Sequence, residues 1–125
     1  MQNDREKFKN DFIKRLISFS LKILKLTGSI KKEPNLWPLS DQLIRCSTSI
    51  GANVVEAKSS SSKKEYINYF QIALKSANET KYWLLLLREY KKGDKISEEA
   101  NKLLQEAEEI SNILGSSILT LKNKK

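Results

Sequence analysis

The feature that most constrains the fold is the spacing of the apolar residues, which recur every three or four positions along most of the 125-residue chain. The first run consists of Phe12, Leu16, Phe19, Ile23, Leu26 and Ile30. Residues at this spacing share one face of an α-helix, which has about 3.6 residues per turn. The chain also holds only 4 glycines and 2 prolines, the two residues that most disfavour helices. An all-α fold is therefore predicted.

Short breaks divide the pattern into four segments. The sequence predicts helices near 4–31, 38–58, 62–92 and 97–122. Connections of only a few residues favour antiparallel packing of consecutive helices. We therefore expect residues 1–125 to form one domain, an up-down four-helix bundle.

Three local signals set the expected helix ends. Ser62 followed by Glu65 is a capping box, in which each side chain can accept a free backbone N–H at the start of the third helix. Gly93 is predicted to end that helix. Ser97, with two glutamates behind it, is predicted to begin the fourth, since the helix dipole favours negative charge there.

The first and third helices have wider apolar faces than one core requires. The first carries a second stripe, Ile13, Ile17, Leu21 and Leu24. The third carries a second stripe that includes Tyr69, Ile72, Trp83, Leu86 and Tyr90. The apolar arc of the third helix covers roughly 200°, whereas a helix facing one core needs about 100°. The excess predicts self-association.

Composition argues against several classes of protein. The longest apolar run, Leu84 to Leu87, is far shorter than the roughly 20 residues that span a bilayer, and the first residues lack the apolar stretch of a signal peptide. Cys46 has no second cysteine to pair with, which favours a reducing, cytoplasmic setting. The chain has no histidine, so histidine-based zinc sites, di-iron sites and catalytic triads are excluded. We expect no metal, no cofactor and no enzymatic activity.

The second and third helices carry polar residues beside their apolar stripes. The set comprises Gln42, Arg45, Ser49, Asn53, Glu56, Ser76 and Glu79. If the two helices pack side by side, Arg45 and Asn53 can meet Glu56 or Glu79. Buried charges are tolerated only when they are paired and hydrogen-bonded. A structural network is the favoured interpretation, with a ligand or nucleic-acid contact and then catalysis as alternatives.

Positive charge is unevenly distributed along the chain, whose net charge is +8. Residues 1–33 hold nine basic and four acidic side chains, and residues 59–93 hold seven and three, whereas residues 94–119 hold two and six. A basic face suggests RNA or DNA as a partner, and lysine suits contact with phosphates better than readout of bases. The alternative is a solvated lysine face with no partner. The predicted contacts are Lys14, Arg15, Lys22, Lys25, Lys63, Lys64, Lys75, Lys81, Lys122, Lys124 and Lys125.

Two sequence patterns carry a family resemblance. The first is formed by Trp37, Pro38, Leu39, Gln42, Arg45, Ser49, Ile50, Asn53 and Glu56. The second is formed by Ser62, Glu65, Tyr66, Tyr69, Phe70, Ile72, Ala73, Ser76 and Glu79. Together they resemble a bacterial four-helix-bundle family encoded in intervening sequences of 23S ribosomal RNA genes, some members of which were labelled S23 ribosomal proteins. The chain departs from the family in one place, because Ala57 stands where a glycine is usual.

The resemblance implies a left-handed up-down bundle that assembles into a homopentamer and has no known enzymatic activity. The family is also similar to the accessory protein of diversity-generating retroelements, a basic pentameric bundle that binds nucleic acid and a reverse transcriptase. Two alternative functions are therefore expected. One is an oligomeric nucleic-acid-binding protein, and the other is an oligomeric protein-interaction scaffold, for example an accessory subunit of a reverse transcriptase.

Overall fold

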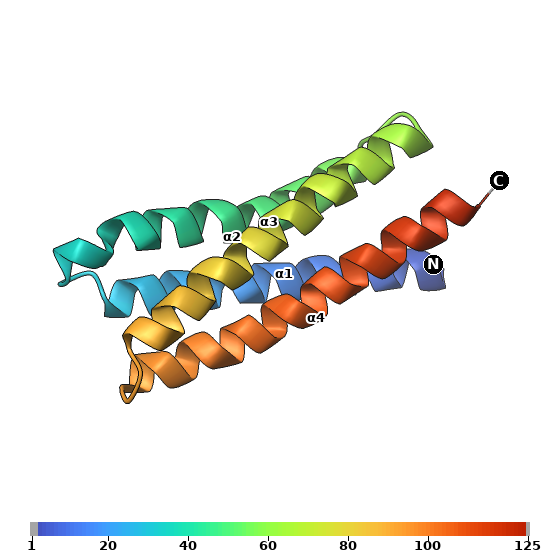
Figure 1. Ribbon diagram of the computed structural model, residues 1–125. Coiled ribbons are helices and arrows are strands. Elements are labelled where there is room, and N and C mark those ends of the chain that lie inside the picture. Colours follow the sequence, from blue (N-terminus) through green and yellow to red (C-terminus); the bar gives the residue numbers. More distant parts are fainter. Residues whose placement is uncertain (1–2, 125) are drawn as a thin grey trace.

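The computed structural model describes residues 3–124 and contains four long helices (Figure 1). Their bounds are α1 Asp4–Ser29, α2 Trp37–Ala57, α3 Lys63–Tyr90 and α4 Lys95–Asn123, with a short 3-10 turn, η1 Pro34–Leu36, before α2. No β-strand occurs within residues 3–124. The prediction of an all-α fold with four helices is confirmed, and each helix boundary lies within two residues of the predicted one.

Each helix returns along the one before it. The α1–α2 and α3–α4 connections lie at one end of the molecule in Figure 1, and the α2–α3 connection and both ends of the chain lie at the other. Helix α3 packs against α2 and α4, and α1 packs against α2 and α4, so that α1 and α3 are diagonal neighbours. At the first end, the Nζ atom of Lys91 donates to both carboxylate oxygens of Glu33 at 2.7 Å, which ties the two connections together.

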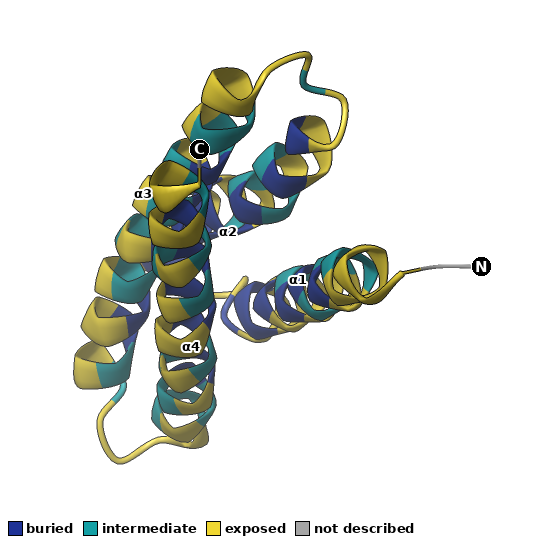
Figure 2. Ribbon diagram, turned by 90° about the vertical axis from the view of Figure 1, so that its right-hand side faces the viewer, coloured by how far each residue is buried: buried dark blue, intermediate teal, exposed yellow. Residues whose placement is uncertain are grey.

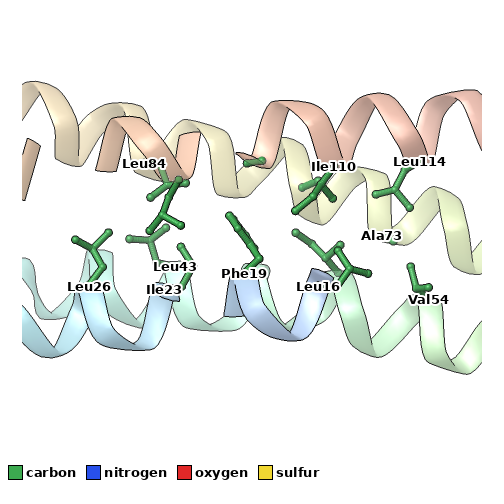
Figure 3. Close-up of a cluster of buried hydrophobic side chains, with 14 of the residues drawn as sticks. Leu16, Phe19, Ile23, Leu26, Leu43, Val54, Ala73, Leu84, Ile110 and Leu114 are labelled. Carbon is green, nitrogen blue, oxygen red and sulfur yellow. The ribbon is translucent and has the colours of Figure 1, made fainter. Parts of the chain in front are cut away.

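The core runs along the inside of all four helices (Figure 3). The predicted stripe of α1 is buried throughout, from Phe12 to Ile30. It meets Leu43 and Ile50 of α2 and the buried faces of α3 and α4, which include Leu84. Burying a side chain of this size contributes about 1.5–3 kcal/mol relative to leaving it exposed, so these contacts hold the bundle together.

The helix ends follow ordinary capping chemistry, with one difference from the prediction. The hydroxyl of Ser62 accepts the backbone N–H of Glu65 at 3.0 Å, as the capping box requires. Gly93 has a φ of +91°, the left-handed region that glycine adopts freely, and it ends the turn after α3. Helix α4, however, begins at Lys95, because Asp94 accepts the N–H of Ile96 at 2.9 Å and acts as the cap.

Ser97 was the residue predicted to begin α4, and its hydroxyl has a different role. It donates to the backbone oxygen of Arg88 at 2.8 Å and thus links the two helices across their connection.

None of the helices within residues 3–124 combines the length and the hydropathy of a membrane span.

Candidate functional site

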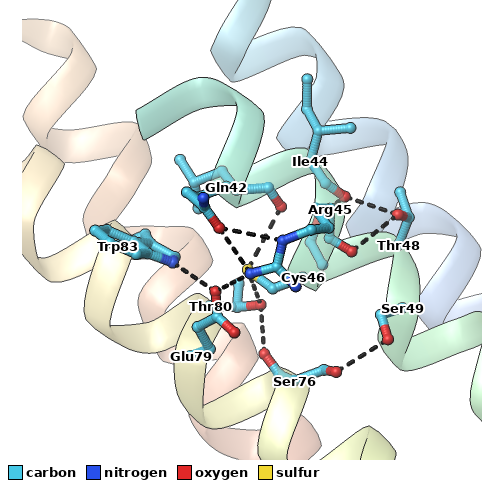
Figure 4. Close-up of polar contacts among 12 residues, drawn as sticks. Gln42, Ile44, Arg45, Cys46, Thr48, Ser49, Ser76, Glu79, Thr80 and Trp83 are labelled. Carbon is cyan, nitrogen blue, oxygen red and sulfur yellow. Dashed lines mark hydrogen bonds and ion pairs between the residues drawn. The ribbon is translucent and has the colours of Figure 1, made fainter. Parts of the chain in front are cut away.

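Most of the predicted polar set lies where α2 packs against α3 (Figure 4). The guanidinium of Arg45 donates to the Gln42 side-chain oxygen at 2.7 Å and forms an ion pair with the Glu79 carboxylate. The indole N–H of Trp83 donates to the same carboxylate at 3.0 Å. Two helices are thereby joined through one acidic side chain, which accepts from both Arg45 and Trp83.

A second group lies further along the contact between α2 and α3. The hydroxyl of Ser76 donates to that of Ser49 at 3.0 Å. The amide of Asn53 donates to the backbone oxygen of Ser49 at 2.8 Å and to its hydroxyl at 3.0 Å. Six of the seven predicted network residues therefore form two small hydrogen-bonded groups between α2 and α3.

Glu56 is the exception, because the structure does not bring it to the other six. It is exposed and lines a shallow hollow between α1 and α2, beside Ile17 and Leu21. The network is also more open than the sequence suggested, since the side chains of Arg45 and Glu79 are 59% and 36% exposed. Within the single chain, this is a solvent-accessible ion pair and not a buried one.

Cys46 lies beneath this network and is fully buried. Thr80 donates its hydroxyl to the sulfur at 3.1 Å. Burial raises the pKa of the Cys46 thiol, because the thiolate would lose its hydration there. A buried thiol that resists ionisation is a packing residue, which agrees with its position in the apolar stripe.

Most of the predicted nucleic-acid contacts are exposed. Those on the surface that make no ion pair with described residues are Lys14, Lys22, Lys25, Lys64, Lys75, Lys122 and Lys124. Lys63 is exposed as well and donates to the backbone oxygen of Lys124, which leaves its charge unbalanced. Lys125 lies outside the described residues.

Two of the predicted contacts are instead engaged within the chain. Arg15 donates from Nε and Nη2 to the Glu106 carboxylate, both at 2.7 Å, and from Nη2 to Glu109 at 3.1 Å. Lys81 donates to Glu108 and to the hydroxyl of Ser111, both at 3.1 Å. These pairs join α4 to α1 and to α3, and they neutralise much of the charge that a phosphate would meet.

The Arg15 contact also changes the titration of its partner. The hydrogen bond from Arg15 is the main reason that the pKa of Glu106 lies below its usual range, and it outweighs the opposing effect of burial. The pKa of Arg15 is raised for the same reason. Arg15 is therefore a structural link between α1 and α4 in this chain.

The excess apolar residues lie on two separate surfaces, one on each side of α2. On α1, Ile17, Leu21 and Leu24 are 44–55% exposed, and the first two line the α1–α2 hollow. On α3, Ile72 and Leu86 are 38% and 45% exposed and lie in the stripe that also carries Glu79. Neither surface is covered by the described chain.

A large cleft lies at the end of the bundle that holds both chain termini. Figure 2 views the bundle from that end, where the ribbon of α1 lies apart from the ribbons of α3 and α4. Its volume is about 810 Å³, and it is lined by the N-terminal parts of α1 and α3, the C-terminal part of α4 and the α2–α3 connection. Its walls hold Phe8 and Tyr66, and Arg5 and Lys9 lie at the same place. Burial raises the pKa of the Tyr66 hydroxyl.

The cleft was not predicted from the sequence. The stretch from Arg5 to Lys9 interleaves basic residues with Phe8, a pattern suited to nucleic acid. Because Phe8 precedes Phe12 by four positions, the periodicity alone extends the core stripe to it. Only the structure shows that Phe8 is 54% exposed.

Comparison with known proteins places this bundle in a family. The family model described as "23S rRNA-intervening sequence protein" matches residues 9–116. A crystal structure of a protein of unknown function from the S23 ribosomal protein family of Bacteroides thetaiotaomicron is 34% identical and superimposes with a TM-score of 0.77. The similarity covers 86% of this chain and 97% of that one, whereas no curated protein matches. The family match spans most of the chain and agrees with the shared fold, and the chain therefore belongs to the 23S rRNA-intervening sequence protein family.

Proposed function

We propose that this protein is a non-enzymatic, homo-oligomeric bundle that binds RNA or DNA through its lysine-rich surfaces. The observation that carries the proposal is the set of exposed lysines on α1, represented by Lys14, Lys22 and Lys25, none of which makes an ion pair with described residues. The family description, which refers to an intervening sequence of 23S rRNA, supports RNA as one candidate partner.

The charge pattern favours phosphate contact over base readout. Lysine ammonium groups on flexible stems act as point charges and do not present the planar donors that recognise base edges. The acidic side chains of α4 are partly used in binding Arg15 and Lys81, so the free positive charge is concentrated on the faces of α1 and α3. We expect binding that tolerates sequence and depends on salt.

Self-association follows from the two apolar surfaces on either side of α2. Because the α1 surface and the α3 surface differ, a contact that joins one to the other is heterologous, and a heterologous contact that closes produces a ring. We propose such a ring. By resemblance to the family, each subunit is a left-handed antiparallel bundle and the ring contains five subunits. Each lysine face would then repeat around the ring, and weak sites would add through multivalency.

The test of the lysine faces uses a triple variant, Lys14→Gln, Lys22→Gln and Lys25→Gln. A double variant on α4, Lys95→Gln and Lys102→Gln, is the matched control, since these lysines are exposed but lie in the acidic segment. With fluorescently labelled structured RNA at about 50 mM salt, the triple variant is expected to bind at least 10-fold more weakly and the control within about 2-fold of the wild type. Equal effects of the two variants would contradict the proposed faces.

A second function is favoured by the exposed ion pair between α2 and α3. Arg45, Glu79 and Trp83 lie beside the open apolar stripe of α3, an arrangement suited to a protein partner. In this alternative the protein is a cytoplasmic scaffold, such as an accessory subunit of a reverse transcriptase, and its lysines make no direct contact with nucleic acid. Absence of RNA and DNA binding by the wild-type protein at about 50 mM salt would favour this alternative.

A further inference from the structure

The terminal cleft has the size of a ligand site. Its volume of about 810 Å³ falls within the range of about 300–1,000 Å³ that is typical of sites for small molecules. The cleft lies at the opposite end of the molecule from the Glu33–Lys91 contact that ties the other connections together. It is separate from the α1 lysines Lys14, Lys22 and Lys25, although Lys63 and Lys124 of the predicted contacts contribute to its lining.

Aromatic rings form two walls of the cleft. On α1, Phe8 stacks on Phe12 with ring centroids 6.3 Å apart and an angle of 17° between the planes. On α3, Tyr66 stacks on Phe70 at 4.9 Å and 22°. The inner ring of each pair, Phe12 or Phe70, is buried in the core, whereas Phe8 is 54% exposed. Phe8 thus offers a ring face that the core does not use, whereas Tyr66 is half-buried and already contacts both Phe70 and Lys9.

Positive charge lines the same cleft. Arg5, Lys9, Lys63 and Lys124 all contribute to its lining, and no Asp or Glu of the described residues does. The Nζ atom of Lys9 lies 4.9 Å from the centroid of the Tyr66 ring, which is a cation–π contact within the cleft. Four cations around apolar walls favour a ligand that is anionic at one part and flat and apolar at another.

We propose that the cleft holds an unpaired segment of single-stranded nucleic acid, with a base stacked on Phe8 and the adjoining phosphates contacting Arg5, Lys9, Lys63 and Lys124. A nucleotide joins a flat base to a phosphate, so the base suits the aromatic wall of the cleft and the phosphate suits its basic side chains. A base within a duplex is stacked and paired, so it cannot reach the rings. Because every base has a π face, the cleft selects for single strands and not for a sequence.

This inference rests on the proposed nucleic-acid binding and adds a preference that the lysine faces do not provide. Lysines on an open helix surface contact the phosphates of single and double strands alike. The cleft must therefore raise the affinity for single strands relative to duplexes, and its aromatic rings must be responsible for the difference.

The test compares Phe8→Leu with Tyr82→Leu in the full chain. Leucine keeps an apolar contact with Phe12 and removes the π face. Tyr82 is the matched control, because it is 58% exposed, lies outside the cleft and also packs against another aromatic residue, Trp83. Affinities for a short single-stranded RNA and for the same sequence as a duplex are measured at about 50 mM salt, and thermal unfolding verifies that each variant is folded.

Phe8→Leu is expected to weaken binding of the single strand about 10-fold, the loss typical of one stacked base, and to leave duplex binding unchanged. Tyr82→Leu is expected to change neither. No effect of Phe8→Leu, or equal losses for the single strand and the duplex, would overturn the cleft and leave the lysine faces standing. If the wild type binds neither RNA, the nucleic-acid function fails as a whole and the cleft proposal with it.

Two further readouts locate the contact. Single-stranded RNA that contains 5-bromouridine is expected to cross-link, on irradiation, to the peptides that hold Phe8 or Tyr66, whereas cross-links confined to the segment from Lys14 to Lys25 would overturn the proposal. The mass of the assembly is expected to be the same for the wild type and Phe8→Leu. A change in mass would show that the cleft is a contact between copies of the chain.

Discussion

Arg45 and Glu79 meet across two helices, yet water reaches both side chains in the single chain. Their contact was predictable because the third helix carries an acidic residue in its second stripe and the second helix carries a basic residue beside its own. The separation of Glu56 from this network was not predictable in the same way. Glu56 lies eleven residues from Arg45 on one helix, a rise of about 16 Å at 1.5 Å per residue, so sharing a face did not bring the two together.

The openness of this network sets the cost of removing it. Glu79→Ala is expected to lower the free energy of unfolding by about 1 kcal/mol, since exposed ion pairs contribute little and water can replace the carboxylate at Arg45 and Trp83. Glu56→Ala is the control, and it should change stability by less than about 0.5 kcal/mol. Urea unfolding measures both. A loss of more than about 3 kcal/mol for Glu79→Ala would mean that another subunit buries the pair in the assembly.

The pair between Arg15 and Glu106 gives stability a defined dependence on pH. The pKa of Glu106 is lower in the folded protein than in the unfolded chain, where a glutamate titrates near pH 4.3. Its contribution is therefore complete above that value and is lost as pH falls through the lower, folded pKa. Urea unfolding of the wild type and Arg15→Met should show a stability difference that is larger at pH 7 than at pH 3.

Lys14→Met serves as the control for that prediction, because Lys14 is exposed and makes no ion pair with described residues. A difference between the wild type and Arg15→Met that stays the same at both pH values would show that Arg15 acts through packing and not through the Glu106 carboxylate.

At the scale of the helices, apolar periodicity predicted which residues are buried better than it predicted where each helix begins and ends. The first stripe of α1 is buried as predicted because a helix in a bundle must turn its apolar face inward. The start of α4 was placed too late, since Asp94 and Ser97 are both good caps and the choice depends on the turn at Gly93. The cleft could not be predicted from the sequence, because the distance between the ends of neighbouring helices depends on how the helices pack and not on the periodicity within each one.

The glycines within helices provide a test of how closely α1 and α2 approach. A Cβ atom added at Gly51 would lie 3.6 Å from the Cβ atom of Leu16, an ordinary contact, and one added at Gly115 would meet nothing within 4 Å. Both Gly51→Ala and Gly115→Ala are therefore expected to stabilise the protein by about 0.5–1 kcal/mol, because alanine favours the helix. Gly93→Ala is the control and should destabilise it, given its positive φ.

Thermal unfolding measures these three variants. If Gly51→Ala destabilises the protein while Gly115→Ala stabilises it, α1 or another copy of the chain must approach Gly51 more closely than the single chain shows.

At the scale of the whole molecule, the apolar surfaces on α1 and α3 are exposed in the single chain, and they are the proposed contacts between subunits. Leu21→Glu places a charge in the middle of the α1 surface, where Leu21 is 54% exposed, and is expected to reduce the assembly to the 14.4 kDa monomer. Leu119→Glu is the control, since Leu119 is 64% exposed on α4, away from both surfaces. Light scattering at micromolar concentration measures the mass.

The wild type and the Leu119→Glu control are both expected to have about five times the mass of the chain. A wild-type protein that is monomeric under these conditions would contradict the ring, and an equal loss of assembly in both variants would contradict the assignment of the α1 surface.

The salt dependence of nucleic-acid binding tests the central claim most directly. The affinity of the wild type for structured RNA and for DNA is measured at about 50 mM and about 200 mM salt, the range over which phosphate contacts weaken. Four lysine–phosphate contacts predict a fall of about 100-fold, with little preference for sequence. Absence of binding at the lower salt concentration, or binding that is selective for sequence and insensitive to salt, would contradict the account.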